Sequence, residues 1–164
     1  MRHYAYAHLI FAATGLATGR TRRQPMLKFA YRAVKKFNFY ARRHNPRRPQ
    51  MPTPELQREL ARRLAEEARE LAEAATLKDV IDAIIDSVYI ALDCCCVLGV
   101  NPSPFFRIVH SANMRKANTP DGWMKTHPVT GKVLKPEGWV SPDAEIESEL
   151  ARQQNLSCEE TKKA

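Results

Sequence analysis

The feature that most constrains this chain is a predicted helix over residues 76–99 that is apolar almost all round yet carries acids one turn apart. Asp79, Asp82 and Asp86 lie among valine, isoleucine, alanine and leucine, so we expect this helix to be buried. A buried carboxylate without a counter-charge is very costly. Something positive must therefore lie beside the helix, and a divalent cation is the best candidate. The pattern points to metal-dependent chemistry on phosphates.

A second group of acids, Glu66-Glu67-x-x-Glu70, lies on the preceding predicted helix. Because each helical residue advances by about 100°, Glu67 falls in the middle of the face marked by three leucines, and Glu70 borders it. A solvated run of charge would avoid this face, which is formed by Leu60, Leu64 and Leu71. The connection at 75–76 is short, so the two helices should be antiparallel neighbours with their acids facing each other. Oxygen-only ligands suit Mg²⁺ or Mn²⁺.

Strand patterns are nearly absent, so we expect an all-α fold, a bundle of four helices. A stripe of Leu27, Ala30, Tyr31, Val34, Phe37 and Ala41 marks the first helix, and Phe29 is also expected in the core. Residues 118–142 contain glycine, proline and two tryptophans and are expected to form a long ordered loop, a lid, with a short hairpin around Gly131. The predicted helices cover residues 26–44, 54–75, 76–99 and 103–117.

Charge and length suggest three parts. The 164 residues fit one domain, with a net charge of +8 and no acid before Glu55. Such a basic segment attracts nucleotides, nucleic acid or an acidic partner. We expect an accessory segment at 1–25, a folded domain at 26–142 and a polar tail at 143–164 that starts as a short helix and then frays.

The four cysteines indicate reduced thiols in a cytoplasmic protein. Cys94, Cys95 and Cys96 are consecutive on one helix and diverge around its axis, and Cys158 lies in the polar tail. No Cys-x-x-Cys pair supports zinc. No apolar run reaches membrane-spanning length.

Several of these acids can also be explained without a metal ion. Glu59, Glu66 and Glu73 fit surface acids that pair with nearby arginines on their own helix. Asp79 follows Thr76 by three residues, the spacing of a capping box, and Asp93 fits an ion pair with a basic residue. These readings leave Glu67, Glu70, Asp82 and Asp86 as the acids that are hardest to explain without a metal or a substrate.

The acids Glu66-Glu67-x-x-Glu70 followed by Asp79-x-x-Asp82 resemble the motif of the MazG-like all-α nucleoside triphosphate pyrophosphohydrolases. The family carries E-E-x-x-E and then E-x-x-D, so Asp79 stands where the family has glutamate. The wider run, with Asn113-Met114-x-Lys116 and Gly131-Lys132-Val133-x-Lys135, resembles a phage and bacterial branch similar to phosphoribosyl-ATP pyrophosphohydrolase.

This resemblance implies hydrolysis of a nucleoside triphosphate to a monophosphate and pyrophosphate with two or three Mg²⁺, or Mn²⁺, per site. It implies a homo-oligomer, a dimer or a dimer of dimers, with each site built from helices of one subunit and loops of a neighbour. Phage members suggest a purine deoxynucleotide such as dGTP. Expected metal ligands are Glu67, Glu70, Asp82 and Asp79; Glu66 or Asp86 is the catalytic base; Asn113, Lys116, Lys132, Lys135 and Trp123 are expected to bind substrate.

Several alternatives stay open. Each lysine is consistent with a solvated surface charge as well as with a phosphate-binding role. Trp123 and Trp139 are somewhat more consistent with anchoring the loop, that is, pinning it in place, than with stacking on the nucleotide base. His110 fits a structural hydrogen-bonding role. The competing classes are a basic helical nucleic-acid-binding protein, supported by the acid-free first third, and a non-catalytic nucleotide-binding protein. An acidic groove repels a phosphate backbone unless metals intervene, which argues against nucleic acid at the acids.

Overall fold

The computed structural model describes residues 26–41 and 43–160, and within that part the chain is built from helices, with a single isolated β-bridge. The expected accessory segment at 1–25 lies outside the described residues, as do Arg42 and the last four residues. The all-α expectation is confirmed. The elements are α1 (Met26–Tyr40), α2 (Pro54–Glu73), α3 (Leu77–Val97), α4 (Pro102–Met114), the 3₁₀ turn η1 (Arg115–Ala117) and α5 (Asp143–Glu160).

Local capping explains where the central helices begin. The Thr53 hydroxyl accepts a hydrogen bond from the backbone N–H of Leu56 (3.3 Å), and Pro54 opens α2. Thr76 caps α3 in the same way. The cap of α4 is Asn101, which accepts from the Ser103 N–H (3.1 Å), so α4 begins at Pro102, one residue before the predicted start at 103.

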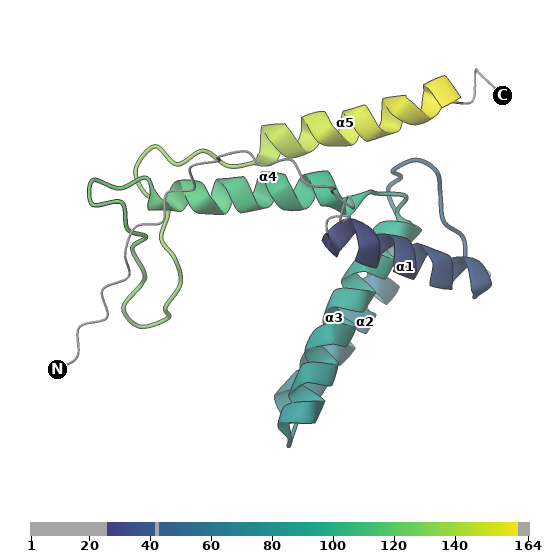
Figure 1. Ribbon diagram of the computed structural model, residues 1–164, viewed down its shortest axis with the longest axis horizontal. Helices are drawn as coiled ribbons and strands as arrows, with labels where there is room; N and C mark the ends of the chain where they lie inside the picture. The colour runs from purple at the N-terminus through teal and green to yellow at the C-terminus, as the bar shows by residue number, and fades with distance from the viewer. Residues whose placement is uncertain (1–25, 42, 161–164) are drawn as a thin grey trace, which may run out of the picture.

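Figure 1 shows two arms that meet at a corner. The α2 and α3 helices form one arm and lie side by side as the short connection predicts, and α1 crosses near its upper end. The second arm consists of α4 with α5 along it. The chain direction changes by 120° between α3 and the helix that starts at Pro102. No helix in the described part of the chain is by itself long and apolar enough to cross a membrane.

The corner depends on close backbone packing. Gly99 follows α3 with a φ of +71°, and a Cβ built there would lie 2.3 Å from the carbonyl oxygen of Arg48. The connector between α1 and α2, which includes Arg48 and Gln50, is tied to the same point by the Gln50 N–H, which donates to the Leu98 carbonyl (3.1 Å). On the far side, Gln153 of α5 accepts from the Asn101 N–H (2.9 Å) and donates to its carbonyl (3.0 Å). Only glycine fits the corner without displacing the connector.

The core is small and lies where α1 crosses α3. Val34, Leu92 and Cys96 are buried there, with Leu27, Ala30 and Tyr31 packed against them. The expectation that Phe29 and Phe37 belong to the core is wrong, since both are exposed, and Ala41 is exposed as well. Phe37 still contacts Tyr89 of α3 edge to face, with ring centroids 5.8 Å apart, so it lies at the rim of the contact between α1 and α3 and not inside it.

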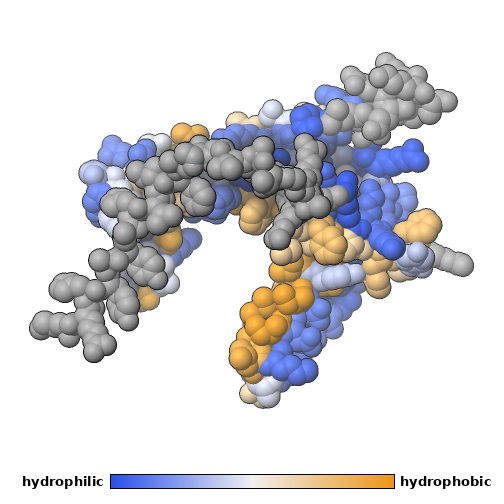
Figure 2. Space-filling view, in the orientation of Figure 1, coloured by the Kyte–Doolittle hydropathy of each residue, from blue (hydrophilic) through white to orange (hydrophobic). Residues whose placement is uncertain are grey.

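The expectation that α3 is buried is also wrong within one chain. Its lower half exposes five apolar side chains, Leu77 at the start of the helix and four more along it, and Figure 2 shows this hydrophobic surface along the α3 arm. On α2, Leu60 is buried but Leu64 and Leu71 are exposed, so the leucine face is only partly covered. A single chain has too few helices around this hairpin to cover it. We call the exposed set on α3, formed by Ile81, Ile84, Ile85 and Val88, the apolar face.

The segment after η1 is ordered by local contacts. The predicted hairpin near Gly131 is confirmed by the antiparallel bridge between Thr126 and Val133 and by the His127 N–H, which donates to the Lys132 carbonyl (2.8 Å). The helix after the loop is longer than the sequence predicts, since α5 continues to Glu160. It is held by Gln153 at the corner and by a pair between Arg115 and Glu145 (3.2 Å).

Candidate functional site

Glu67 is the most unusual carboxylate in the described part of the chain. Its Oε2 atom is shielded from solvent and has no hydrogen-bond partner among the described residues. Loss of hydration raises its pKa first, and the nearby charges of Glu70, Asp86 and Glu66 raise it further, while Arg63 acts in the opposite direction. An ionised carboxylate in this position is short of positive charge.

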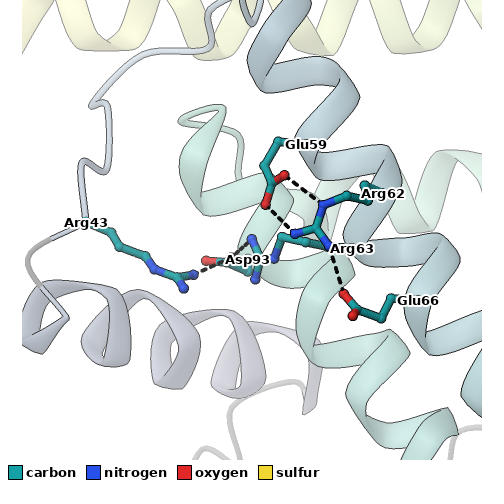
Figure 3. A network of polar contacts seen from close by, with 6 residues as sticks. All are labelled: Arg43, Glu59, Arg62, Arg63, Glu66 and Asp93. Atoms are coloured by element: carbon teal, nitrogen blue, oxygen red, sulfur yellow. Dashed lines mark hydrogen bonds and ion pairs between the residues drawn. The ribbon is translucent and has the colours of Figure 1, made fainter.

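The same electrostatics show which acids gather. Glu66 and Glu70 on α2 and Asp86 on α3 are all close enough to Glu67 to act on its pKa, so the two helices do bring these acids together. We call these four residues the acidic cluster. Glu66 also contacts Arg62, whose Nη1 lies 3.2 Å from its Oε2 (Figure 3), so the surface-pair interpretation of Glu66 is confirmed. Arg62 and Arg69 likewise pair with Glu59 and Glu73.

The two remaining predicted ligands lie differently. Asp79 accepts a hydrogen bond from the Thr76 hydroxyl (2.6 Å), and its own N–H donates back to that oxygen (3.2 Å). The Thr76 hydroxyl is the main reason that the pKa of Asp79 is lowered. This is the capping arrangement that the spacing allows. Asp82 is exposed on α3, one turn before Asp86. Across the described residues, no three acidic, histidine or cysteine side chains converge closely enough to hold an ion as they stand.

The most deeply buried acid is Asp93, and its counter-charge comes from arginine. Asp93 is 1% exposed, and its Oδ2 lies 2.6 Å from Arg63 Nη1 and 2.9 Å from Arg43 Nη1. The Asn38 side-chain amide donates to Oδ1. Figure 3 shows Arg43 reaching Asp93 from the end of α1, and Arg63 beside Asp93. The ion pair suggested by the sequence is therefore confirmed, and Asp93 joins three segments.

Most of the predicted substrate-binding residues gather at the end of α4. Trp139 donates from Nε1 to the Ala112 carbonyl (2.9 Å), which confirms that it pins the loop. The ammonium groups of Lys135 and Lys116 lie 4.5 Å and 5.7 Å from the centre of its ring. Lys116 also donates to Asn113 Oδ1 (2.8 Å). We call Asn113, Lys116, Lys135 and Trp139 the basic cluster. Trp139 was not among the predicted substrate contacts, although its place between the two lysine motifs is a usable signal.

Two other predicted contacts lie outside this cluster. Lys132 is exposed on the hairpin. Trp123 is 75% exposed, so the expectation that it pins the loop is wrong. Its backbone N–H donates to Asp121 (3.1 Å), and the contacts of Asp121 with Lys125 and Thr119 hold its pKa well below the usual range. This ordered turn presents the Trp123 ring to solvent.

The comparisons with known proteins bear on the segment that holds the acids. Residues 34–113 match the model of the family described as phosphoribosyl-ATP pyrophosphohydrolase. This match covers 80 of the 164 residues, from α1 to α4. A solved structure from Exiguobacterium sp. 255-15, provisionally assigned as an NTP pyrophosphohydrolase, is 23% identical over 82% of this chain and 99% of its own, with a TM-score of 0.43. No curated protein matches the chain.

The matched segment includes the acidic cluster and ends at Asn113, so the rest of the basic cluster lies beyond it. Figure 1 shows that the two clusters are on different arms. Asp86 and Asn113 are each about 16 Å from the corner along their helices, at 1.5 Å per residue. Within one chain the two halves of the expected site are therefore apart.

Three thiols lie near the upper end of α3 and are poorly suited to metal binding. Burial raises the pKa of Cys95 to about 11 and that of Cys96 to about 12, with smaller contributions from neighbouring groups. Burial also raises the pKa of Cys94. Thiols rather than thiolates are thus expected at neutral pH.

Proposed function

We propose that this chain is a divalent-metal-dependent diphosphatase that converts a nucleoside triphosphate and water into the monophosphate and pyrophosphate. The observation that carries the proposal is Glu67: a shielded oxygen without a partner, surrounded by three further carboxylates. An arrangement of this kind raises the free energy of the chain unless a cation is bound. The substrate we favour is a purine deoxynucleotide such as dGTP, on the strength of the resemblance alone.

The donor set fits Mg²⁺ or Mn²⁺. Glu67, Glu70 and Asp82 offer carboxylate oxygens from two adjacent helices, which are the ligands that these hard cations prefer. Asp79 would join them after releasing its cap contact with Thr76. Ligation would require these side chains to rotate towards a common point, because they do not converge on one as they stand. Two or three bound ions would neutralise the triphosphate and make a bound water more acidic.

Proton transfer falls to an acid that is not engaged in ligation. Arg62 holds Glu66 in an ion pair (3.2 Å), which already engages one of its carboxylate oxygens. Asp86 forms no ion pair within the described residues, and it lies beside Glu67. We therefore favour Asp86 over Glu66 as the base that accepts the proton of the attacking water.

The substrate's phosphates also need positive charge, and we propose that a second copy of the chain supplies it. The exposed apolar face on α3 is typical of an interface rather than a solvated surface. Covering it with a second copy would place another chain's arm beside the acidic cluster. The ammonium groups of Lys116 and Lys135 could then reach the phosphates, with Asn113, Lys132 and Trp123 as further contacts.

The direct test is product analysis with a panel of ribo- and deoxynucleoside triphosphates and Mg²⁺ or Mn²⁺. We expect monophosphate with pyrophosphate, loss of turnover on adding a chelator, and losses of at least about 100-fold in Glu67→Gln and Asp82→Asn. Glu55→Gln is the matched control, because Glu55 is an exposed acid of α2 paired with Arg58 (3.0 Å). Normal turnover in both site variants would refute the placement of the site, and orthophosphate as the product would refute the reaction.

A mixing experiment tests the shared site. Glu67→Gln removes the acidic half and Lys116→Ala with Lys135→Ala removes the basic half, so each chain alone should be inactive. In a dimer of mixed chains one site keeps both halves, and up to about a quarter of the activity should return after co-refolding. If the mixture stays inactive while size analysis shows mixed oligomers, the two halves do not come from different copies.

A further inference from the structure

The outer face of α1 is basic and aromatic, and the proposed reaction does not use it. The helix and the connector that follows carry no acid, since the first in the chain is Glu55. Lys28, Lys35, Lys36, Phe39 and Tyr40 fall within about 140° of the helix circumference at 100° per residue. The buried side of α1 points the opposite way, towards α3. This face therefore combines positive charge with exposed rings.

Two of the rings are almost fully presented to solvent. Phe39 is 75% exposed and Tyr40 is 71% exposed, and they contact each other edge to face with centroids 5.7 Å apart. The ammonium group of Lys36 lies 6.0 Å from the centre of the Tyr40 ring. Large exposed rings at neighbouring positions are unfavourable in water, so a binding partner for their faces would stabilise them.

An open cavity continues this surface beyond the end of α1. It has a volume of about 790 Å³ and is lined by Phe39, Tyr40, Arg43, His44 and Asn45. The Arg43 guanidinium is held by the buried Asp93, yet its side chain is still 43% exposed and lines the cavity. Around this end of the molecule Figure 2 shows hydrophilic and hydrophobic surface side by side. Flat rings, a fixed cation and amide and imidazole hydrogen-bonding groups thus line one space.

We propose that the outer face of α1, with this cavity, binds single-stranded nucleic acid. A row of lysines matches the repeated charge of a phosphate backbone, and aromatic faces stack on bases. A duplex hides its base faces, so an unpaired strand fits the rings better. The acidic cluster lies on other helices and would repel a strand, whereas this face bears no opposing charge. The site is independent of the proposed hydrolysis.

The test uses the full chain and a fluorescently labelled deoxythymidine oligonucleotide of about 15 nucleotides, a length within the range of known single-strand sites. We expect binding that weakens with salt and is weaker for a duplex of the same length. Lys35→Gln with Lys36→Gln should reduce the slope of log affinity against log salt by about 1.4, or 0.7 for each phosphate contact. Phe39→Leu with Tyr40→Leu should lower the affinity at least about fivefold for each ring.

The leucine variants keep an apolar side chain and remove the flat faces, together with the hydroxyl of Tyr40, and circular dichroism checks that α1 persists. Phe106→Leu is the matched control, because Phe106 is a 62% exposed ring on α4. Hydrolysis of nucleoside triphosphates should be unchanged in the α1 variants. The proposal is overturned if the oligonucleotide does not bind, if the leucine variants bind it as well as the wild type, or if only phosphatidylserine vesicles are bound.

Discussion

Replacing Asp93 by alanine should destabilise the fold more than any exchange of an exposed charge. Asp93 is buried and satisfies three donors on separate segments, the Arg63 and Arg43 guanidiniums and the Asn38 amide. Removing one partner of a buried ion pair costs about 3–5 kcal/mol, because the other charge is left unpaired. The Arg63 side chain is only 19% exposed, so it bears most of this cost. We expect a loss of about 4 kcal/mol for Asp93→Ala.

The burial of the two arginines predicts a ranking. Arg63→Ala should cost about 3 kcal/mol, whereas the more exposed Arg43 should cost no more than about 1 kcal/mol. Glu55→Ala, at an exposed pair, is the control and should change stability by less than about 1 kcal/mol. Urea unfolding at fixed protein concentration gives the free energies, and Asp93→Ala should lower the Tm by about 10 °C. A cost below 1 kcal/mol for Asp93→Ala, or equal costs for both arginines, would refute the reasoning.

Three further predictions concern single positions. Gly99→Ala should destabilise by at least about 1 kcal/mol in urea unfolding, because the new Cβ meets a connector carbonyl and φ is positive; an unchanged midpoint would contradict the corner geometry. The raised pKa of Glu67 means that its stabilising contribution is present below about pH 4.3 and is lost as the pH rises through its folded pKa. Without metal the wild type should therefore gain stability over Glu67→Gln on acidification, and Mg²⁺ should abolish this difference; parallel pH profiles would argue against it. Trp139→Phe removes the donor to the Ala112 carbonyl and should cost about 1 kcal/mol while loosening the loop, as measured by amide exchange at 118–142; unchanged protection would show that other contacts hold the loop.

The elements with local signals were predictable from the sequence. Thr53 followed by Pro54 marks the start of α2, and the Thr76 spacing marks both the start of α3 and the cap role of Asp79. The convergence of Glu67 and Glu70 with Asp86 followed from helical spacing and a short turn, because antiparallel neighbours leave little freedom. These features depend on interactions within a few residues or across one tight connection.

Features set by packing between distant segments were not predictable. The sequence suggests that Asp93 pairs with a basic residue, but which arginines it meets, Arg43 and Arg63, depends on how α1 crosses the α2–α3 pair. The apolar pattern of α3 predicts that this face is shielded from water. It does not predict whether the shielding residues come from the same chain or from another copy. For the same reason Phe37 looked like a core residue, since helical spacing alone cannot show where a contact line ends.

The corner between the two arms also has a mechanical meaning. The basic cluster lies at the end of a lever about 16 Å long whose pivot is the backbone around Gly99 and Asn101. A rotation of about 10° there would move the far end by about 3 Å, which is the length of a hydrogen bond. Gln153 hydrogen-bonds to both the backbone N–H and the carbonyl of Asn101, and these two bonds restrain that rotation. Small substitutions at the pivot could thus shift the reach of the lysines without touching them.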